Sequence, residues 1–250
     1  MFINPPIESP QNVFHKTFYS QVLNNEVGYN IYLPPEYNNS DKKYPVDYHI
    51  HGWKGNESSE LKPLEKVYPN RDMITVFINA ISLKENYFDV LLEIEFVLLH
   101  ELIPHIDGHY RTNTTRNSRM LSGFSMGGNM AFYYAVKHND LFCSVISYAG
   151  TFHHLYNKEY RTVGVAPEKV MNLYNDMLRE KWYLEDNNIL SLVRKNADKI
   201  RGKLNIEMHI GTTDILLCDN EIMHLYLDSL NIPNVYKKYP GVDHNLERIL

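Results

Sequence analysis

The first forty residues contain two short segments in which hydrophobic and polar side chains alternate. Residues 17–22 and 27–33 follow this pattern on either side of the polar pair Asn24-Asn25. Alternation around a polar turn is typical of a β-hairpin with one buried face. Pro34-Pro35 then ends the second strand, because proline has no backbone N–H for a sheet ladder.

More continuous apolar segments come next, followed by a long periodic one. Residues 46–50 and 73–79 have the length and apolar content of buried strands. From residue 88 to residue 106, apolar side chains then recur every three or four positions, which describes one face of a long helix packed on a sheet. Those positions are Phe88, Leu92, Phe96, Leu99, Ile103 and Ile106.

The middle of the chain reads as a strand, a helix and a strand. Residues 118–123 predict a strand, residues 126–137 a helix, and the apolar segment 143–148 a second strand. This succession implies parallel strands joined by a helical crossover. We therefore expect a mixed, mostly parallel central sheet flanked by helices.

A helical interruption follows the strand at 143–148. Residues 151–203 show helical patterns at about 167–182 and 186–200 and no strand pattern, so we interpret them as a small, cap-like helical insertion near the site. The alternation then resumes with a strand at 205–210, a helix at 219–230, a strand at 235–239 and a loop at 240–244.

The composition is that of one globular domain. The chain has 250 residues, of which 44% are hydrophobic and 22% are charged, enough to bury a full core. No internal repeat, low-complexity tract or linker-like segment divides it. We therefore expect a single domain over residues 1–250.

Charge and apolar runs argue against two classes of partner. The net charge is -5 and no long Lys/Arg run occurs, so the sequence shows no electrostatic footprint for nucleic acid or an anionic membrane. No stretch approaches the ~20 apolar residues that cross a bilayer. A small-molecule or polysaccharide-linked substrate fits this composition better.

The start of the sequence, from Met1 to Pro6, lacks the charged region and apolar run of a signal peptide. Asn-x-Ser/Thr sequons begin at Asn38, Asn56 and Asn113 and are compatible with secretion. We expect a secreted protein whose signal peptide is not part of this sequence, with a cytoplasmic location as the alternative.

Metal and redox chemistry find little support. The two cysteines, Cys143 and Cys218, have neither metal-type nor redox-type spacing, and a disulfide between them stays open. His49 and His51 lie on one face of a strand, but no Cys or carboxylate at ligand spacing completes a metal site. We expect no metal and no cofactor.

The segment Gly123 to Gly128 reads Gly-Phe-Ser-Met-Gly-Gly, a G-x-S-x-G pattern between a predicted strand and a predicted helix. A turn there lifts the Ser125 hydroxyl above the carboxyl edge of the sheet, and the helix N-terminus supplies N–H groups for an oxyanion. A capping serine would give the same short pattern, so the strand-turn-helix context carries the assignment of Ser125 as nucleophile.

A serine hydroxyl needs a base, and the base needs a group that fixes its tautomer. Asp214 and His244 follow the last two predicted strands, so both reach the sheet edge that carries Ser125. We predict His244 as general base and Asp214 as its orienting acid. Asp243 is a weaker rival, because a residue adjacent to the histidine cannot easily reach its Nδ1.

The oxyanion hole needs two backbone donors. One is the N–H of Met126, and the other comes from the loop His51-Gly52-Trp53-Lys54-Gly55 after the strand at 46–50. We favour Trp53, with Gly52 and Lys54 as alternatives. Three aromatic residues are expected to line the substrate cleft: Trp53, Tyr87 and Trp182.

Together these residues resemble the esterase D and feruloyl esterase family of α/β-hydrolases, close to the carbohydrate esterases. The landmarks are Tyr32-Leu33-Pro34-Pro35, His51-Gly52, Glu101-Leu102-Ile103-Pro104, Gly123 to Gly128, Gly211-Thr212-Thr213-Asp214, and His244. The resemblance implies an α/β-hydrolase fold. It places the family's nucleophile, acid and base on Ser125, Asp214 and His244, and its oxyanion donors on Trp53 and Met126.

The resemblance also implies a substrate. It indicates a feruloyl esterase that releases ferulate from the arabinoxylan of plant cell walls through an acyl-enzyme. An acetylxylan esterase or an S-formylglutathione-type thioesterase is the alternative. From a different class, a catalytically inactive carbohydrate-binding relative remains a third hypothesis.

Overall fold

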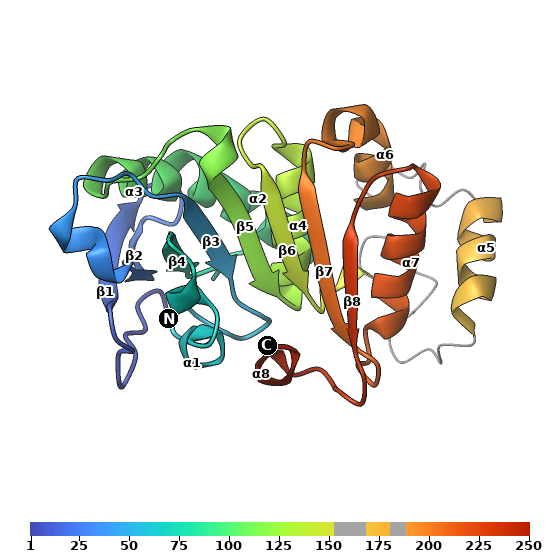
Figure 1. The fold of residues 1–250 in the computed structure, drawn as a ribbon, viewed down its shortest axis with the longest axis horizontal. Helices are drawn as coiled ribbons and strands as arrows, with labels where there is room; N and C mark the ends of the chain where they lie inside the picture. Colours follow the sequence, from blue (N-terminus) through green and yellow to red (C-terminus); the bar gives the residue numbers. More distant parts are fainter. Residues whose placement is uncertain (153–168, 181–188) are drawn as a thin grey trace.

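The computed structural model describes residues 1–152, 169–180 and 189–250, and in them an eight-stranded sheet carries helices on both faces (Figure 1). The strands are β1 Val13–Ser20, β2 Asn25–Tyr32, β3 Val46–Ile50, β4 Ile74–Ile78, β5 Arg119–Phe124, β6 Ser144–Tyr148, β7 Asn205–Gly211 and β8 Val235–Tyr239. The helices are α1 Leu61–Leu64, α2 Tyr87–Phe96, α3 Ile103–His109, α4 Met126–Lys137, α5 Val170–Glu180, α6 Ile189–Ile200, α7 Leu217–Ser229 and α8 Leu246–Ile249.

The sheet has the order β1-β2-β4-β3-β5-β6-β7-β8. β1 and β2 form the antiparallel hairpin, β2 pairs antiparallel with β4, and every pairing from β4 to β8 is parallel. The mostly parallel α/β sheet expected from the sequence is therefore confirmed. After β3 the chain goes first to one side, to β4, and then to the other side, to β5. In such sheets a crevice opens beyond the carboxyl ends of the strands at this reversal, so the topology places a site beyond β3 and β5.

Most predicted elements are present with bounds shifted by a few residues, and the first strand, predicted at 17–22, is Val13–Ser20. The helix at 126–137 and the strand at 46–50 have the predicted bounds. The predicted continuous helix from 88 to 106 is interrupted, because a π-helical segment, Val97–Leu102, separates α2 from α3. Pro104 is the second residue after this segment, and a proline has no N–H for the carbonyl four residues earlier and collides with it. A wider helical turn before the proline relieves that conflict.

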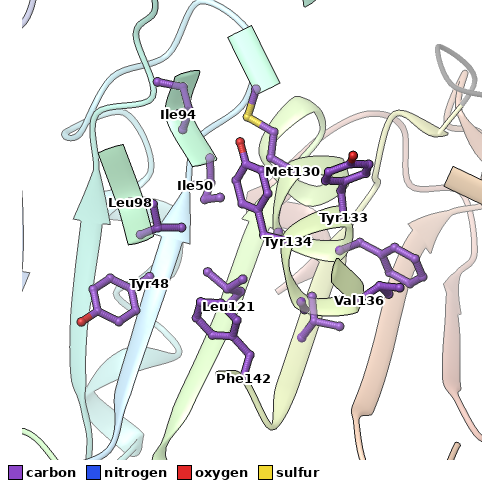
Figure 2. Close-up of a cluster of buried hydrophobic side chains, with 14 of the residues drawn as sticks. Tyr48, Ile50, Ile94, Leu98, Leu121, Met130, Tyr133, Tyr134, Val136 and Phe142 are labelled. Atoms are coloured by element: carbon purple, nitrogen blue, oxygen red, sulfur yellow. The ribbon is translucent and has the colours of Figure 1, made fainter. Parts of the chain in front are cut away.

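A large hydrophobic core lies between one face of the sheet and helices α2 and α4 (Figure 2). Alternate residues of β3, namely Val46, Tyr48 and Ile50, face this core. Tyr134 of α4 is fully buried there, and its hydroxyl donates to the carbonyl of Leu91 at 2.7 Å. Burial raises the pKa of Tyr134, so the phenol stays protonated and keeps this bond between the two helices.

The other face of the sheet has its own, smaller core. Its members include Tyr32, Leu61, Leu64, Tyr68, Phe77, Leu246 and Ile249. Leu61 and Leu64 come from α1, and Leu246 and Ile249 from α8, the two short helices near the carboxyl ends of the strands (Figure 1). These helices cover the sheet on the side where the topology places a site.

The predicted insertion at 151–203 is described only in part. α6 packs against α4, and its residues Ile189, Leu190 and Val193 are fully buried in the main core. Because its apolar face packs in the main core, α6 is part of the crossover between β6 and β7 and not part of a cap over the site. α5 contacts α7, and the Tyr174 hydroxyl donates to the carbonyl of Leu225 at 3.3 Å. Residues 153–168 and 181–188 lie outside the described part.

The structure also bears on the two cysteines and on membrane-spanning helices. Cys143 and Cys218 are both free thiols, so no disulfide joins them. Across the described residues, no helix combines the length and the apolar character that a bilayer crossing demands.

Two glycine substitutions test how tightly α4 packs on the sheet. A Cβ at Gly127 would lie 1.9 Å from the carbonyl oxygen of Ile50, whereas one at Gly108 would meet nothing within 4 Å. We expect Gly127→Ala to lower the free energy of unfolding by at least about 2 kcal/mol, because α4 must move away from β3. Gly108→Ala, on the exposed face of α3, should raise it by roughly 0.5–1 kcal/mol.

Urea denaturation of both variants beside the parent measures these changes. A Gly127→Ala protein as stable as the parent would show that the contact between α4 and β3 is not tight.

Candidate active site

Ser125 occupies the sharp turn between β5 and α4. Its backbone has φ 55° and ψ -115°, a left-handed conformation that non-glycine residues seldom adopt. Its N–H donates to the carbonyl of Tyr148 at 2.8 Å, and its carbonyl accepts from the N–H groups of Asn129 and Thr151, each at 3.1 Å. Three backbone bonds thus hold a turn that costs about 1–3 kcal/mol in strain.

The structure brings Ser125, His244 and Asp214 together in one hydrogen-bonded chain. The Ser125 Oγ lies 2.9 Å from Nε2 of His244, and Nδ1 of the same ring lies 2.8 Å from Oδ2 of Asp214. The Asp214 side chain is fully buried, while that of His244 is 28% exposed. The other carboxylate oxygen, Oδ1, accepts the N–H of Leu216 at 2.8 Å, so both oxygens of Asp214 are fixed.

The loop that carries His244 is fastened to the loop that carries Asp214. A Cβ at Gly211 would lie 2.0 Å from the carbonyl oxygen of Val242, so only glycine lets the two loops approach this closely. The N–H of Thr213 donates to that same carbonyl at 3.0 Å. The His244 ring also stacks on Phe124, with centroids 4.7 Å apart. These contacts fix the imidazole between carboxylate and hydroxyl.

Asp243 does not take part in this chain. Its carboxylate pairs with Arg248 at 2.9 Å, and both side chains are more than half exposed. The carboxylate adjacent to the histidine in sequence therefore points away from the imidazole Nδ1 that Asp214 contacts.

A tight turn after β3 faces Ser125. Its four residues, Gly52 to Gly55, are closed by a bond from the Gly55 N–H to the Gly52 carbonyl at 3.0 Å, with Lys54 at φ 62°. The N–H of Gly52 donates to Oε1 of Glu60 at 2.8 Å. Because these two N–H groups are engaged, Trp53 and Lys54 carry the candidate oxyanion donors of this turn, opposite the N–H of Met126 at the start of α4.

His51 anchors the base of this turn with both ring nitrogens. Its Nδ1 lies 2.8 Å from the Gly52 carbonyl, and its Nε2 lies 3.0 Å from the N–H of Ala80. An imidazole that accepts at Nε2 must be neutral and donate from Nδ1. Burial lowers the pKa of His51, which is consistent with that state.

Two hollows meet at the turn. The larger, of about 490 Å³, is lined by Ser125, His244 and Phe124 on one side and by Trp53, Glu60 and Pro63 on the other. The smaller, of about 190 Å³, lies beyond Trp53 and Lys54 and includes Met126, Ile81 and Val90. Trp53 is 66% exposed and lines both, so an aromatic face stands at the rim beside the Ser125 hydroxyl.

The other two aromatic residues expected in the cleft are Tyr87 and Trp182. Tyr87 is half-buried, and its hydroxyl accepts from Nδ2 of Asn129 at 2.7 Å. It is not among the residues named above for either hollow, and its place in the cleft stays a prediction. Trp182 lies outside the described residues.

The His49 and His51 pair does not form a metal site. His49 contacts Ser122 and Glu60, whereas His51 contacts backbone groups. Within residues 1–152, 169–180 and 189–250, no group of three or more His, Cys, Asp or Glu side chains is arranged to hold a metal ion.

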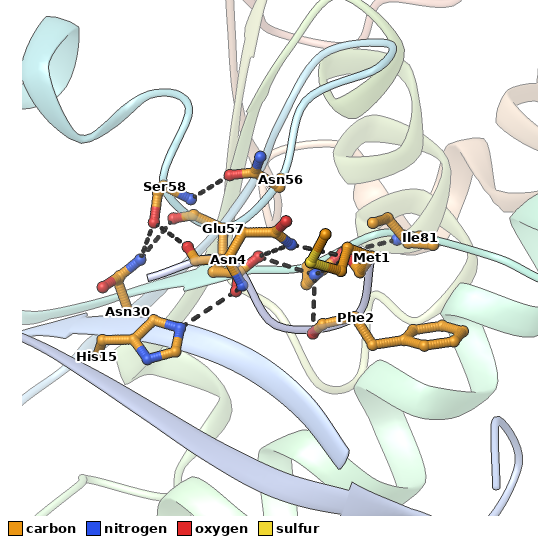
Figure 3. Close-up of polar contacts among 10 residues, drawn as sticks. Met1, Phe2, Asn4, His15, Asn30, Asn56, Glu57, Ser58 and Ile81 are labelled. Carbon is orange, nitrogen blue, oxygen red and sulfur yellow. Dashed lines mark hydrogen bonds and ion pairs between the residues drawn. The ribbon is translucent and has the colours of Figure 1, made fainter. Parts of the chain in front are cut away.

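Sequence reasoning missed two buried glutamates that follow the turn, Glu57 and Glu60. Glu57 is 1% exposed and anchors the N-terminal segment (Figure 3). Its carboxylate accepts from the N–H of Asn4 at 2.5 Å and from Nδ2 of Asn79 at 2.8 Å, and lies 3.2 Å from Nε2 of His15. Acidic residues in a loop are usually exposed to solvent, so their burial was not predicted. The only feature of the sequence that could have indicated a role for them is their position just after the glycine-containing loop 51–55.

Comparisons with known proteins bear on the family and the fold of this chain. The Esterase family model, described as "Putative esterase", matches residues 20–223. Among curated proteins, the chain is similar to the endo-1,4-beta-xylanase/feruloyl esterase of Xylanibacter ruminicola, 30% identical over 137 residues, which are 47% of this chain and 18% of that protein. The chain spans a third or less of the length of the curated relatives that it matches.

Solved structures share the fold. A ferulic acid esterase from the anaerobic fungus Anaeromyces mucronatus superposes with a TM-score of 0.70 at 22% identity, covering 97% of this chain and 88% of the other. An S-formylglutathione hydrolase from Staphylococcus aureus gives 0.68 at 16% identity, covering 94% and 92%. The α/β-hydrolase fold predicted from the sequence is confirmed, and the two scores are too similar to distinguish the substrates.

The burial of His51 should make the stability of the folded protein depend on pH. Because its pKa is lowered in the folded protein, the unfolded chain takes up a proton first as pH falls below about 6.5. The folded protein should therefore lose stability as pH falls through that value, and His105 and His209, whose pKa values are also lowered by burial, act in the same direction.

NMR titration of the imidazole resonances, with that of His51 assigned by its loss in His51→Gln, measures this directly. An inflection for His51 at or above about 6.5 would contradict the neutral, bridging state.

Proposed function

Since this chain belongs to the Esterase family of carboxylic ester hydrolases, we propose that it is a serine esterase that works through an acyl-enzyme on Ser125. The observation that carries the proposal is the unbroken hydrogen-bonded chain from Ser125 through His244 to Asp214, at the edge of a hollow large enough for a small ester. A nucleophile, a base and an orienting acid in contact are the parts that acyl transfer needs.

Acylation begins when the Ser125 oxygen attacks the ester carbonyl carbon and its proton passes to Nε2 of His244. The charge that develops on the carbonyl oxygen is held by the N–H of Met126 and by that of Trp53, with Lys54 as the neighbouring donor in the turn. His244 then gives its proton to the leaving alcohol oxygen as the carbon–oxygen bond breaks. Water, activated by the same imidazole, cleaves the acyl-enzyme and releases the acid.

Asp214 supports both halves of this cycle. Its buried carboxylate accepts the Nδ1–H of His244, which keeps Nε2 free to take the serine proton. The imidazolium formed in each step is stabilised by the same carboxylate.

For the substrate we propose a hydroxycinnamate ester such as ferulate carried on an arabinoxylan sugar. The xylanase/feruloyl esterase relative and the ferulic acid esterase that shares the fold support this choice. The exposed Trp53 offers a flat face at the rim of the hollow, where an aromatic acyl group or a sugar could stack. The likeness to an S-formylglutathione hydrolase favours a small thioester as the second candidate.

Removing the nucleophile tests the mechanism. Ser125→Ala should lower kcat by at least ~10³-fold on any ester that the parent hydrolyses, because the covalent route is lost. Rates on methyl ferulate, acetylated xylan and S-formylglutathione rank the substrates. Turnover of the formyl thioester alone would exclude the hydroxycinnamate, and a Ser125→Ala protein of near-parental activity would exclude the serine mechanism.

Two neighbouring aspartates give a matched pair of variants. Asp214→Asn should lower kcat by ~10³-fold or more, since an amide that donates toward Nδ1 favours the wrong tautomer of His244. Asp243→Asn removes only an exposed ion pair with Arg248 and should leave kcat within about twofold.

Steady-state kinetics of both variants on one ester decide the assignment. Equal losses in the two proteins would mean that Asp214 has no special part in catalysis.

A further inference from the structure

Five polar residues form a continuous chain under the turn that faces Ser125. From the far end inward they are Arg71, Asp47, Ser122, His49 and Glu60. Asp47, His49 and Ser122 are each only 2% exposed. The proposed reaction uses none of these side chains, so the chain needs another explanation.

Each residue of this chain is within hydrogen-bond distance of the next. Nη1 of Arg71 lies 3.1 Å from Oδ2 of Asp47, which also accepts the Ser122 hydroxyl at 3.0 Å. Nδ1 of His49 lies 2.8 Å from the Ser122 oxygen. Nε2 of His49 lies 2.6 Å from Oε2 of Glu60, whose Oε1 accepts the N–H of Gly52 at 2.8 Å.

Ser122, His49 and Glu60 thus repeat the serine-histidine-carboxylate arrangement of the proposed catalytic residues. They cannot perform the same chemistry, because Ser122 lies inside β5 in register with His49 of β3 and is almost completely buried. No ester could reach its hydroxyl. The chain ends on Arg71 at one side and on Glu60 at the other, and of these two only Glu60 lines the hollow that contains Ser125.

The protons in this chain can be assigned from its contacts. The Ser122 hydroxyl donates to Asp47, so its oxygen is left to accept, and His49 must donate from Nδ1. A single proton then lies between Nε2 of His49 and Oε2 of Glu60. Whichever atom holds it, the pair has no net charge, so Glu60 brings no uncompensated negative charge near a developing oxyanion.

Glu60 ends the chain at the turn itself. It lines the hollow that contains Ser125. A Cβ at Gly52 would lie 3.5 Å from both Oε1 of Glu60 and Cβ of Ser125, so Gly52 sits between the carboxylate and the nucleophile. The bond from the Gly52 N–H to Glu60 fixes the residue from which Trp53 and Lys54 extend.

We propose that Glu60, held by His49, is a positioning residue that fixes Gly52 and thereby directs the next N–H groups of the turn toward the oxyanion formed at Ser125. This inference rests on the proposed function and adds a residue to its machinery. It predicts that loss of Glu60 acts on the transition state and leaves substrate binding in the ground state nearly unchanged.

The test uses Glu60→Met and Glu60→Gln in the full chain. Methionine has a similar length and no acceptor for the Gly52 N–H, so kcat on a reactive ester should fall ~10- to 100-fold with KM within about twofold. Glutamine can accept that N–H through its oxygen and donate to Nε2 of His49, so it should restore kcat to within about threefold of the parent. Glu60→Asp, which retracts the carboxylate, should lose activity like methionine and serves if Glu60→Met does not fold.

Glu95 provides a matched control. It is 8% exposed, as Glu60 is, and its carboxylate also lies 2.6 Å from a histidine Nε2. That histidine is His138, the residue after α4, so this pair joins α2 to the end of α4 and lies away from the turn. Glu95→Met should cost stability and leave kcat within about twofold. Thermal unfolding of all variants separates the two effects.

The rate at which a fluorophosphonate labels Ser125 gives a second readout. Labelling of the parent at Ser125 tests the serine mechanism itself, whereas the ratio of the Glu60→Met rate to the parent rate tests the positioning role. Parental labelling and kcat in Glu60→Met would overturn the proposal alone. So would a glutamine variant as impaired as methionine, or a Glu95→Met variant that loses as much kcat as Glu60→Met.

Discussion

The strained turn at Ser125 is the constraint on which the rest of this sheet edge depends. Its left-handed backbone is held by bonds to Tyr148, Asn129 and Thr151, and it can exist only because α4 approaches the end of β3 with no side chain at Gly127. The same close approach brings the N-terminus of α4 against the turn after β3. One packing contact therefore sets the position of the hydroxyl and of the candidate oxyanion donors together.

Two serine-histidine-carboxylate groups lie near this edge, and burial separates their roles. In the first, Asp214 is buried but His244 and the hollow beside Ser125 are open to solvent. In the second, Ser122 of β5 and His49 of β3 are each only 2% exposed. Buried polar groups are costly unless they are fully paired. Ser122, His49 and Glu60 each have hydrogen-bond partners, and the group ends on the Gly52 N–H, which is where the open site needs a rigid backbone.

The sequence predicted those parts that follow from periodicity and chain order. The helix at 126–137 has a nearly continuous apolar pattern and a glycine start, and Asp214 and His244 follow strands whose ends had to share an edge with Ser125. The break before Pro104 was missed because apolar periodicity continues through it. Asp47 and His49 alternate with apolar residues in β3 as they would on a half-exposed strand, yet all five residues of that strand are buried. The polar side chains of this strand pair with Ser122 of β5 and with Arg71 and Glu60 from the segment between β3 and β4, and no sequence pattern predicts those partners.

If Ser125 is the nucleophile, it carries an acyl group during turnover, and trapping that group is the most direct test of the mechanism. The protein is mixed with a slowly released ester, quenched in acid within the first turnover, and digested for mass spectrometry. The mass of the acyl group should be added to the peptide containing Ser125, at about one group per chain, and the adduct should be lost in Ser125→Ala. Ester turnover with no adduct on that peptide, unchanged in Ser125→Ala, would contradict this mechanism.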